Sequence, residues 1–286
     1  PPPSWKVHWS NDYPDCGGEA QSPIDIQTKS VQHDPSLLPI EPQGYRSPGD
    51  GAFTLRNNGH TVEMSLPPSM FLRGLPQTYA AVQLHFHWGS MDQEEGSEHQ
   101  VNGEGFPAEL HIVHYNSESY ANITEAKEQA DGLAVLGIFI EVSTLEFASL
   151  TLSPPAPPAG QNVSIPPFDV HELLPTQLDH YFRYNGSLTT PPCSQNVLWT
   201  VFRQGVQISS SQLERLQRGL YSTKAANSLP VPLVDNYRAP QPLNQRVPLP
   251  SPFLPRAGEI IAIVSGTLFG CLSIFLTIHF GMKRIR

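Results

Sequence analysis

The chain has 286 residues, a formal net charge of −9 and 15% charged residues. Since 39% of its residues are hydrophobic, the composition excludes a largely disordered chain. The acidic balance argues against nucleic acid as the main partner. The length allows one large domain or two small ones.

Runs rich in β-branched and aromatic residues, separated by Gly, Pro, Asn and Ser, predict strands along most of the chain. The fourth run is apolar almost throughout and predicts a central, buried strand. We find no internal repeat, and we expect a mainly β (α+β) domain with a large mixed sheet and few helices. The predicted strands are TVEMSL (61–66), AAVQLHFHWG (80–89), AELHIVHY (108–115), LAVLGIFIEV (133–142) and NVLWTVF (196–202).

The second predicted strand carries two histidines, His85 and His87, two positions apart. Side chains alternate along a strand, so these two and Gln83 point to one face. Two ring nitrogens at this spacing can bind one metal ion. An H-x-H pattern alone more often marks one buried and one exposed histidine, so further ligands are needed.

The third predicted strand offers another imidazole, from His111 or from His114, which face opposite sides. We favour His111 because Glu109 shares its face, and a metal-bound histidine usually donates its other N–H to such an acceptor. Gln83 can do the same for His85, and His114 is then a core residue. Three neutral histidines and one open position predict a catalytic Zn²⁺ site, where a bound water becomes acidic.

One helix has a clear start signal. Ser211 and Glu214 form a capping-box pattern. Leu213, Leu216 and Leu220 then recur at helical spacing, which predicts one apolar helix face.

The C-terminal part predicts a membrane anchor. No Asp, Glu, Lys or Arg occurs from Ile260 to Met282, which is long enough for a bilayer core of roughly 30 Å. Basic residues follow at once, which predicts a cytoplasmic tail. A buried core helix is the alternative, but the position after a proline-rich connector disfavours it. The predicted parts are an extracellular domain (1–247), a stalk (248–258), a transmembrane helix (259–282) and a tail (283–286).

Export to the cell surface agrees with other features. Cys271 lies in the predicted span, which leaves Cys16 and Cys193 to form a disulfide or remain free thiols, and we favour the disulfide. Three N-x-S/T sequons are candidate glycosylation sites, although each alone is a weak signal. The sequons begin at Asn122, Asn162 and Asn185, and the small residues Ser265, Gly266 and Gly270 in the span are consistent with a homodimer.

Nine segments, in order, resemble the α-class carbonic anhydrases and cover nearly all of residues 8–247. The cysteine pair, the span and the basic tail resemble the membrane-anchored extracellular members. The resemblance implies a ten-stranded mixed, mostly antiparallel twisted sheet with zinc at the base of a conical cleft. The segments are QSPIDI, NNGHTV, QLHFHWG, GSEHQVNG, AELHIVHY, LAVLGIF, YNGSLTTPPC, LWTVF and NYRAPQPLNQR.

The resemblance also implies residue roles. Thr189 matches a hydroxyl that donates to Glu98 and orients the attacking oxygen, and Thr190 matches a residue that helps hold bicarbonate. His60 matches the proton shuttle, with Asn58 near it, and histidine suits that task because it titrates near neutrality. Without the resemblance, His60 would be an ordinary loop histidine. The implied ligands are His85, His87 and His111, with Gln83 and Glu109 behind them; Val113, Val135, Leu188, Val197 and Trp199 match the carbon dioxide pocket.

The apolar pocket residues would otherwise be read as ordinary sheet core. His99 matches a buried structural histidine, and we expect Arg238 to pair with a carboxylate.

Two segments depart from the family. The N-terminal stretch VHWSNDYPDCGG lacks the tyrosine that touches Thr189, and residues 145–167 replace an amphipathic helix. Prolines 154, 155, 157 and 158 predict that this second segment is extended or disordered. Glu63 is a smaller change. A carboxylate facing the cleft would raise the pKa of the shuttle histidine.

The leading hypothesis is a zinc lyase of the plasma membrane, single-pass type I, that reversibly hydrates carbon dioxide to bicarbonate and is blocked by sulfonamide inhibitors. The alternative is a catalytically impaired domain that serves as a binding module. The presence of all three ligand histidines, of Thr189 with Glu98, and of the shuttle His60 weighs against that alternative.

Overall fold

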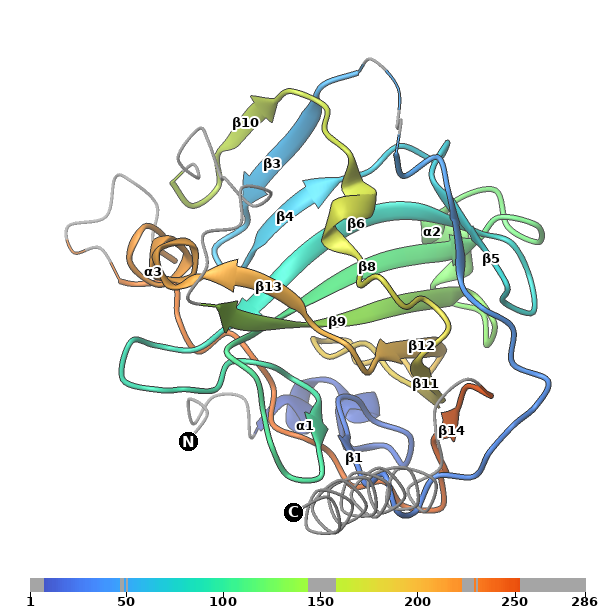
Figure 1. The fold of residues 1–286 in the computed structure, drawn as a ribbon. Coiled ribbons are helices and arrows are strands. Elements are labelled where there is room, and N and C mark those ends of the chain that lie inside the picture. The colour runs from blue at the N-terminus through green and yellow to red at the C-terminus, as the bar shows by residue number, and fades with distance from the viewer. Residues whose placement is uncertain are drawn as a thin grey trace, which may run out of the picture. The chain divides into compact units, whose positions relative to one another are not determined.

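The computed structural model describes residues 8–46, 49, 51–143, 158–222, 229 and 231–252. These residues form a large twisted sheet, a small two-stranded parallel sheet and five short helices (Figure 1). The small sheet pairs β1 (Asp25–Ile26) with β7 (Gln100–Val101). The helices are α1 (Trp9–Asp12), η2 (Pro14–Gly17), α2 (Ile123–Ala126), η4 (Val170–Leu173) and α3 (Ser210–Arg218).

The large sheet is mixed, because β12 and β13 run parallel to β9 while the other pairs are antiparallel. Its main path is β10 (Asn162–Ile165), β3 (Phe53–Asn57), β4 (Val62–Ser65), β6 (Tyr79–Trp88), β8 (Ala108–Asn116), β9 (Leu133–Ser143), β12 (Val197–Phe202), β11 (Tyr181–Gly186) and β14 (Leu249–Pro250). The strands β2 (Glu41–Gln43), β5 (Phe71–Arg73) and β13 (Val206–Ser209) pair beside this path.

All five strands predicted from hydrophobic runs are present, and β9 lies between β8 and β12 as the central, buried strand. The predicted number of ten strands is wrong, since the described residues place twelve in the large sheet. The miscounted strands are short and lie at the margin. β2 contains Pro42 and β14 ends in Pro250, and such pieces carry no alternation of apolar and polar residues.

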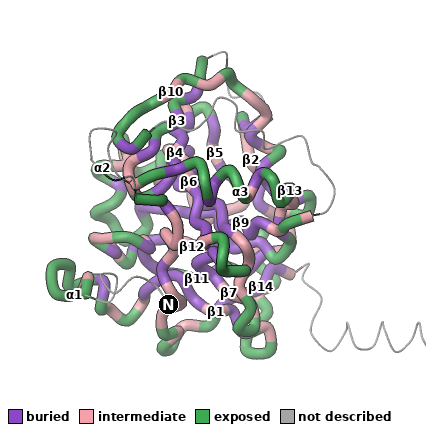
Figure 2. The backbone as a smooth tube through the Cα atoms, turned by 90° about the vertical axis from the view of Figure 1, so that its left-hand side faces the viewer, coloured by how far each residue is buried: buried purple, intermediate pink, exposed green. Residues whose placement is uncertain are grey.

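The two faces of the central strands carry different residues. Leu84 of β6, Ile112 of β8 and Leu136 of β9 are neighbours in register and are almost fully buried in the apolar core. Burial of each such side chain contributes about 1.5–3 kcal/mol. Figure 2 shows this burial through the middle of the sheet. Because side chains alternate, the histidines and Glu109 at the intervening positions share the opposite face.

The helix predicted near residue 211 forms, but its start was placed two residues too late. The capping box of α3 joins Ser209 and Gln212, not Ser211 and Glu214. Ser209 is the last residue of β13 and has extended backbone angles, which the N-cap position requires. Glu214 instead pairs with Arg218 one turn later, at 2.9 Å. The apolar face is as predicted, since Leu216 and Leu220 are buried and Leu213 packs against the same core.

The predicted membrane span at 259–282, the tail at 283–286 and the small residues Ser265, Gly266 and Gly270 lie outside the described residues. Among the helices that the structure describes, none combines the length and apolarity needed to cross a bilayer. One compact unit comprises Pro1–Pro252, so strand β14 continues the sheet beyond residue 247.

The proline-rich segment at 145–167 is described only from residue 158 onward. Its end is strand β10, which pairs with β3 in antiparallel register from Asn162↔Arg56 to Ile165↔Phe53. This part is therefore extended, as predicted, and belongs to the sheet.

Candidate metal centre and active site

The pairing of β6 with β8 brings the three predicted ligand histidines together. His85 lies directly opposite His111, and His87 lies opposite Glu109. The centroids of the three rings are 4.6–5.2 Å apart, and one ligand atom from each histidine lies within 4.8 Å of the other two. His87 and His111 are buried, and His85 is partly buried. Two short strand segments thus build a compact cluster of imidazoles.

Each of the three rings has one nitrogen next to an oxygen acceptor. His85 Nδ1 lies 2.9 Å from Gln83 Oε1, His87 Nδ1 lies 2.9 Å from the backbone oxygen of Asn236, and His111 Nε2 lies 2.7 Å from Glu109 Oε1. Carbonyl and carboxylate oxygens only accept, so these nitrogens carry the hydrogens. A metal would then be held by Nε2 of His85 and His87 and by Nδ1 of His111. Three neutral imidazole nitrogens fit zinc in a catalytic site.

The surroundings shift the pKa values of these buried groups in different directions. Burial, together with the neighbouring His87 and His111 rings, lowers the pKa of His85 well below its usual range. Burial also disfavours a charged His111, but the Glu109 and Glu98 carboxylates outweigh it and raise the pKa of that ring. The neighbouring His99 and His111 rings overcome burial and hold the pKa of Glu109 well below its usual range. Glu109 is thus ionised and accepts hydrogen bonds.

Glu109 has no exposed surface and joins two histidines. Its Oε1 accepts from His99 Nδ1 at 2.6 Å as well as from His111, and its Oε2 accepts the backbone N–H groups of Glu98 and His99, each at 2.8 Å. Gly137 of β9 lies opposite His111 in register. A Cβ atom there would approach Glu109 Oε1 to 3.2 Å, so the missing side chain leaves room for this carboxylate. His99 is buried, as predicted.

Thr189 and Glu98, predicted to act as a pair, are both buried, and the Thr189 hydroxyl lies close enough to Glu98 to shift the pKa of its carboxyl. Burial raises the pKa of Glu98, while His111, the Thr189 hydroxyl and the backbone N–H of Arg238 act against that rise. The Arg238 N–H donates to Glu98 Oε1 at 2.8 Å. Thr190 is exposed, and its carbonyl accepts the N–H of Cys193 at 2.9 Å.

His60, the predicted shuttle, is exposed in the turn between β3 and β4. The Asn58 side chain shapes this turn, because its Oδ1 accepts the N–H groups of His60 and Thr61, each at 2.8 Å. Glu63 of β4 lies opposite His85 in register and therefore faces the same side as the ligand cluster.

Three of the five predicted apolar pocket residues lie next to the cluster. Val113, Val135 and Trp199 are register partners across β8, β9 and β12, one row away from His85 and His111. The Trp199 and His111 rings are 4.9 Å apart. Val197 is buried two residues before Trp199, and Leu188 is partly buried in the loop after β11.

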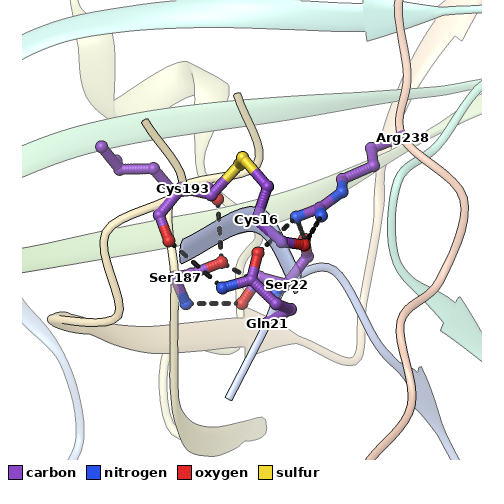
Figure 3. Close-up of a disulfide and its surroundings, with 7 residues drawn as sticks. Cys16, Gln21, Ser22, Ser187, Cys193 and Arg238 are labelled. Carbon is purple, nitrogen blue, oxygen red and sulfur yellow. Dashed lines mark hydrogen bonds between the residues drawn. A yellow bond between two sulfur atoms is a disulfide. The ribbon is translucent and has the colours of Figure 1, made fainter. Parts of the chain in front are cut away.

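The predicted disulfide between Cys16 and Cys193 is present, with a sulfur–sulfur distance of 2.05 Å (Figure 3). The expected pairing of the Arg238 side chain with a carboxylate is not what the structure shows. Its guanidinium donates to Gln21 Oε1 and to the carbonyls of Ser22 and Cys16, at 2.8–2.9 Å. Because these acceptors neighbour the disulfide, Arg238 joins the N-terminal segment to the site.

The three sequon asparagines are exposed, which modification requires. Asn122 also caps α2, because its side chain accepts the N–H of Glu125. Asn162 lies on the edge strand β10, and Asn185 lies on β11.

Comparisons with known proteins identify relatives of this chain. A family model described as eukaryotic-type carbonic anhydrase matches residues 4–249. The chain is 44% identical over 251 residues to carbonic anhydrase 12 of Homo sapiens, covering 86% of this chain and 70% of the relative. It is 42% identical to carbonic anhydrase 6 of Canis lupus familiaris, covering 85% and 76%, and 41% identical to carbonic anhydrase 3 of Homo sapiens, covering 84% and 92%.

Proposed function

Because this chain belongs to the eukaryotic-type carbonic anhydrase family and is a carbonate dehydratase, we propose that its active site is the cluster around His85, His87 and His111. The reaction is the reversible hydration of carbon dioxide, in which CO₂ and water give bicarbonate and a proton. The observation that supports this assignment best is the oxygen acceptor behind each of the three imidazoles.

The family depends on zinc, and the three nitrogens would hold it. When bound, zinc supplies Lewis acidity that, in well-studied carbonic anhydrases, brings the pKa of a coordinated water to about 7.

Residues of the chain orient the reactants. In this proposal, the Thr189 hydroxyl donates its hydrogen to the Glu98 carboxylate, whose pKa is raised by burial and lowered by this contact, and Thr189 keeps a lone pair to accept a hydrogen from the attacking water. The buried row of Val113, Val135 and Trp199 offers carbon dioxide an apolar wall. Thr190, exposed beside Thr189, helps hold bicarbonate, with Val197 and Leu188 completing the pocket.

The proton must then leave the site. His60 is exposed to solvent in its turn, and imidazole side chains are common proton carriers in enzymes. We assign the transfer of the product proton to this residue, with Asn58 shaping its turn.

A pair of histidine variants tests the site. The chain, expressed in a secretory system, is expected to bind about one zinc per molecule and to show sulfonamide-sensitive hydration. His111→Gln removes a ligand and is expected to abolish activity. His114→Gln lies three residues away on the other face, where the ring contacts Tyr45, and should keep it. A folded chain without zinc or activity would instead support the alternative of a catalytically impaired binding module.

We also propose that the enzyme works outside the cell as a single-pass type I protein of the plasma membrane, with its parts divided as predicted. The disulfide and the three exposed sequons support export. Among membrane-anchored members, the sequence motifs resemble carbonic anhydrase XIV first and XII second. Labelling of intact cells with a membrane-impermeant sulfonamide would test this location. Labelling only after permeabilisation would refute it.

A further inference from the structure

We propose that residues 235–238, near the end of the compact unit, position the groups for the hydration step and the group for the proton transfer through separate contacts. In this proposal, the Asn236 side chain holds the turn that carries His60, and Arg238 holds the Thr189–Glu98 pair. The inference rests on the function proposed above. It concerns side chains that are far in sequence from every predicted ligand.

Asn236 contacts both a ligand and the shuttle turn. Its backbone oxygen accepts from His87 Nδ1 at 2.9 Å. Its side-chain Nδ2 donates to the carbonyl of His60 at 3.0 Å and to that of Phe86 at 3.2 Å, while Oδ1 accepts the N–H of Trp88 at 2.8 Å. A change of the side chain therefore leaves the contact of the backbone oxygen with the ligand chemically intact.

The other bonds of the turn do not replace this link. Asn57 and Asn58 accept N–H groups within the turn, so they set its shape. Thr61 donates to the carbonyl of Phe86 and ties the end of the turn to β6. The bond from Asn236 reaches His60 itself, and it fixes that residue relative to His87.

Arg238 acts on the other side of the site. Its backbone N–H donates to Glu98 Oε1, while its buried guanidinium donates to Gln21, Ser22 and Cys16 (Figure 3). Gln21 in turn donates to the carbonyl of Cys193, in the same loop as Thr189. Three side-chain bonds thus hold the backbone from which the N–H points at Glu98.

These two contacts affect different kinetic quantities. The hydration step, which needs Thr189 and Glu98 aligned, determines kcat/KM. The export of the proton follows bicarbonate formation and enters kcat alone. A loss at Asn236 should therefore lower kcat, and a loss at Arg238 should lower kcat/KM.

For Asn236→Ala in weak buffer, we expect kcat to fall about tenfold while kcat/KM stays near that of the wild type. Added imidazole, a small diffusible base, should restore kcat. Asn236→Asp keeps the acceptor for Trp88 but loses both donated bonds. We expect the same loss of kcat from it, and it takes the place of the alanine variant if that variant folds poorly. The matched control is Asn116→Ala, since this buried amide donates to Asp131 at the far end of β8 and should change neither constant.

For Arg238→Lys, we expect kcat/KM to fall about tenfold without rescue by imidazole, because a lysine cannot reproduce the three-acceptor geometry of the guanidinium. The matched control is Arg246→Lys. Its guanidinium also donates to backbone carbonyls, those of Gln21, Pro242, Leu243 and Asn185, and it should leave kcat/KM unchanged.

All variants must retain about one zinc per chain and the wild-type melting behaviour within a few degrees. The proposal is overturned if folded, zinc-loaded Asn236 variants lose kcat/KM and kcat together, or if imidazole rescues Arg238→Lys. A wild-type chain without zinc or hydration activity would refute the proposed function itself, which makes the two failures distinguishable.

Discussion

Glu109 is fully buried and yet accepts four hydrogen bonds, two from histidine rings and two from backbone N–H groups. A carboxylate can satisfy all four donors because both of its oxygens only accept. This arrangement fixes the tautomer of His111, with Nε2 protonated and Nδ1 available to a metal. One residue behind the ligands therefore decides which atom of a ligand faces the site.

Replacement of this carboxylate tests the idea. Glu109→Gln presents an amide NH₂ to two of the four donors, so we expect the affinity for zinc to fall roughly 10- to 100-fold. Competition with a chromophoric chelator measures that affinity. Glu141→Gln is the matched control, because this carboxylate of β9 accepts from Gln207 on the neighbouring strand β13 and not from a histidine ring. Equal zinc affinities of both variants would contradict the role given to Glu109.

His114 offers a prediction about pH and stability. Burial lowers the pKa of His114 to about 3, and its Nε2 lies 2.5 Å from the Tyr45 hydroxyl. An unfolded histidine titrates near 6.5, so between these values the unfolded chain binds a proton that the folded chain does not. The stability contributed by neutral His114 is complete above pH 6.5 and is lost as the pH falls toward 3.

We therefore expect the wild type to lose about 3 kcal/mol more unfolding free energy than His114→Gln between roughly pH 7 and pH 4. Urea unfolding of both proteins at the two pH values measures this difference. Other titrating groups are common to both chains and cancel. Parallel losses in the two proteins would show that His114 does not contribute.

Among the elements, α3 shows how a strand can set the start of a helix. Ser209 ends β13 and caps α3, and its hydroxyl accepts the N–H of Gln212. We expect Ser209→Ala to lower the unfolding free energy by about 1 kcal/mol, and Ser211→Ala, within the first turn, by less. Chemical denaturation of the two variants compares them. A larger loss of unfolding free energy for Ser211→Ala would support the capping box of Ser211 and Glu214 that the sequence predicted.

Long strands could be predicted well and short ones poorly, for a physical reason. β6, β8 and β9 have nine or more residues, so the alternation of core and site faces repeats several times. β2 and β14 have three and two residues and form only because neighbouring strands offer unpaired backbone groups. Tertiary pairing creates such strands, and local sequence carries no sign of it.

The residues of the site also differ in how well the sequence predicts them. His111 could be chosen over His114 because Glu109 shares its face on one strand, and that neighbour is visible in the sequence. Asn236 could not be found by this reasoning, since its bond to His87 joins residues 149 positions apart and uses a backbone oxygen that every residue type possesses. The motif around Asn236 marked the family but not this contact.

For the molecule as a whole, the disulfide closes a very long stretch of chain, because Cys16 and Cys193 are 177 positions apart. A crosslink of this span restricts the unfolded chain strongly. We expect the double variant Cys16→Ser, Cys193→Ser to lose about 2–5 kcal/mol of unfolding free energy. Urea unfolding of the two proteins under non-reducing conditions provides the measurement. An unchanged midpoint would mean that hydrogen bonds such as those of Arg238 already hold the N-terminal segment.

The late position of Asn236 and Arg238 has a consequence for biosynthesis. A ribosome releases His85, His87 and His111 well before it releases the carbonyl that orients His87 and the N–H that binds Glu98. A nascent or prematurely terminated chain therefore contains every metal ligand, together with Gln83 and Glu109, but lacks the acceptor of His87 and the N–H that binds Glu98. We therefore expect tight zinc binding only in chains that extend past residue 238. If zinc is loaded after synthesis, complete chains would bind it and shorter fragments would not.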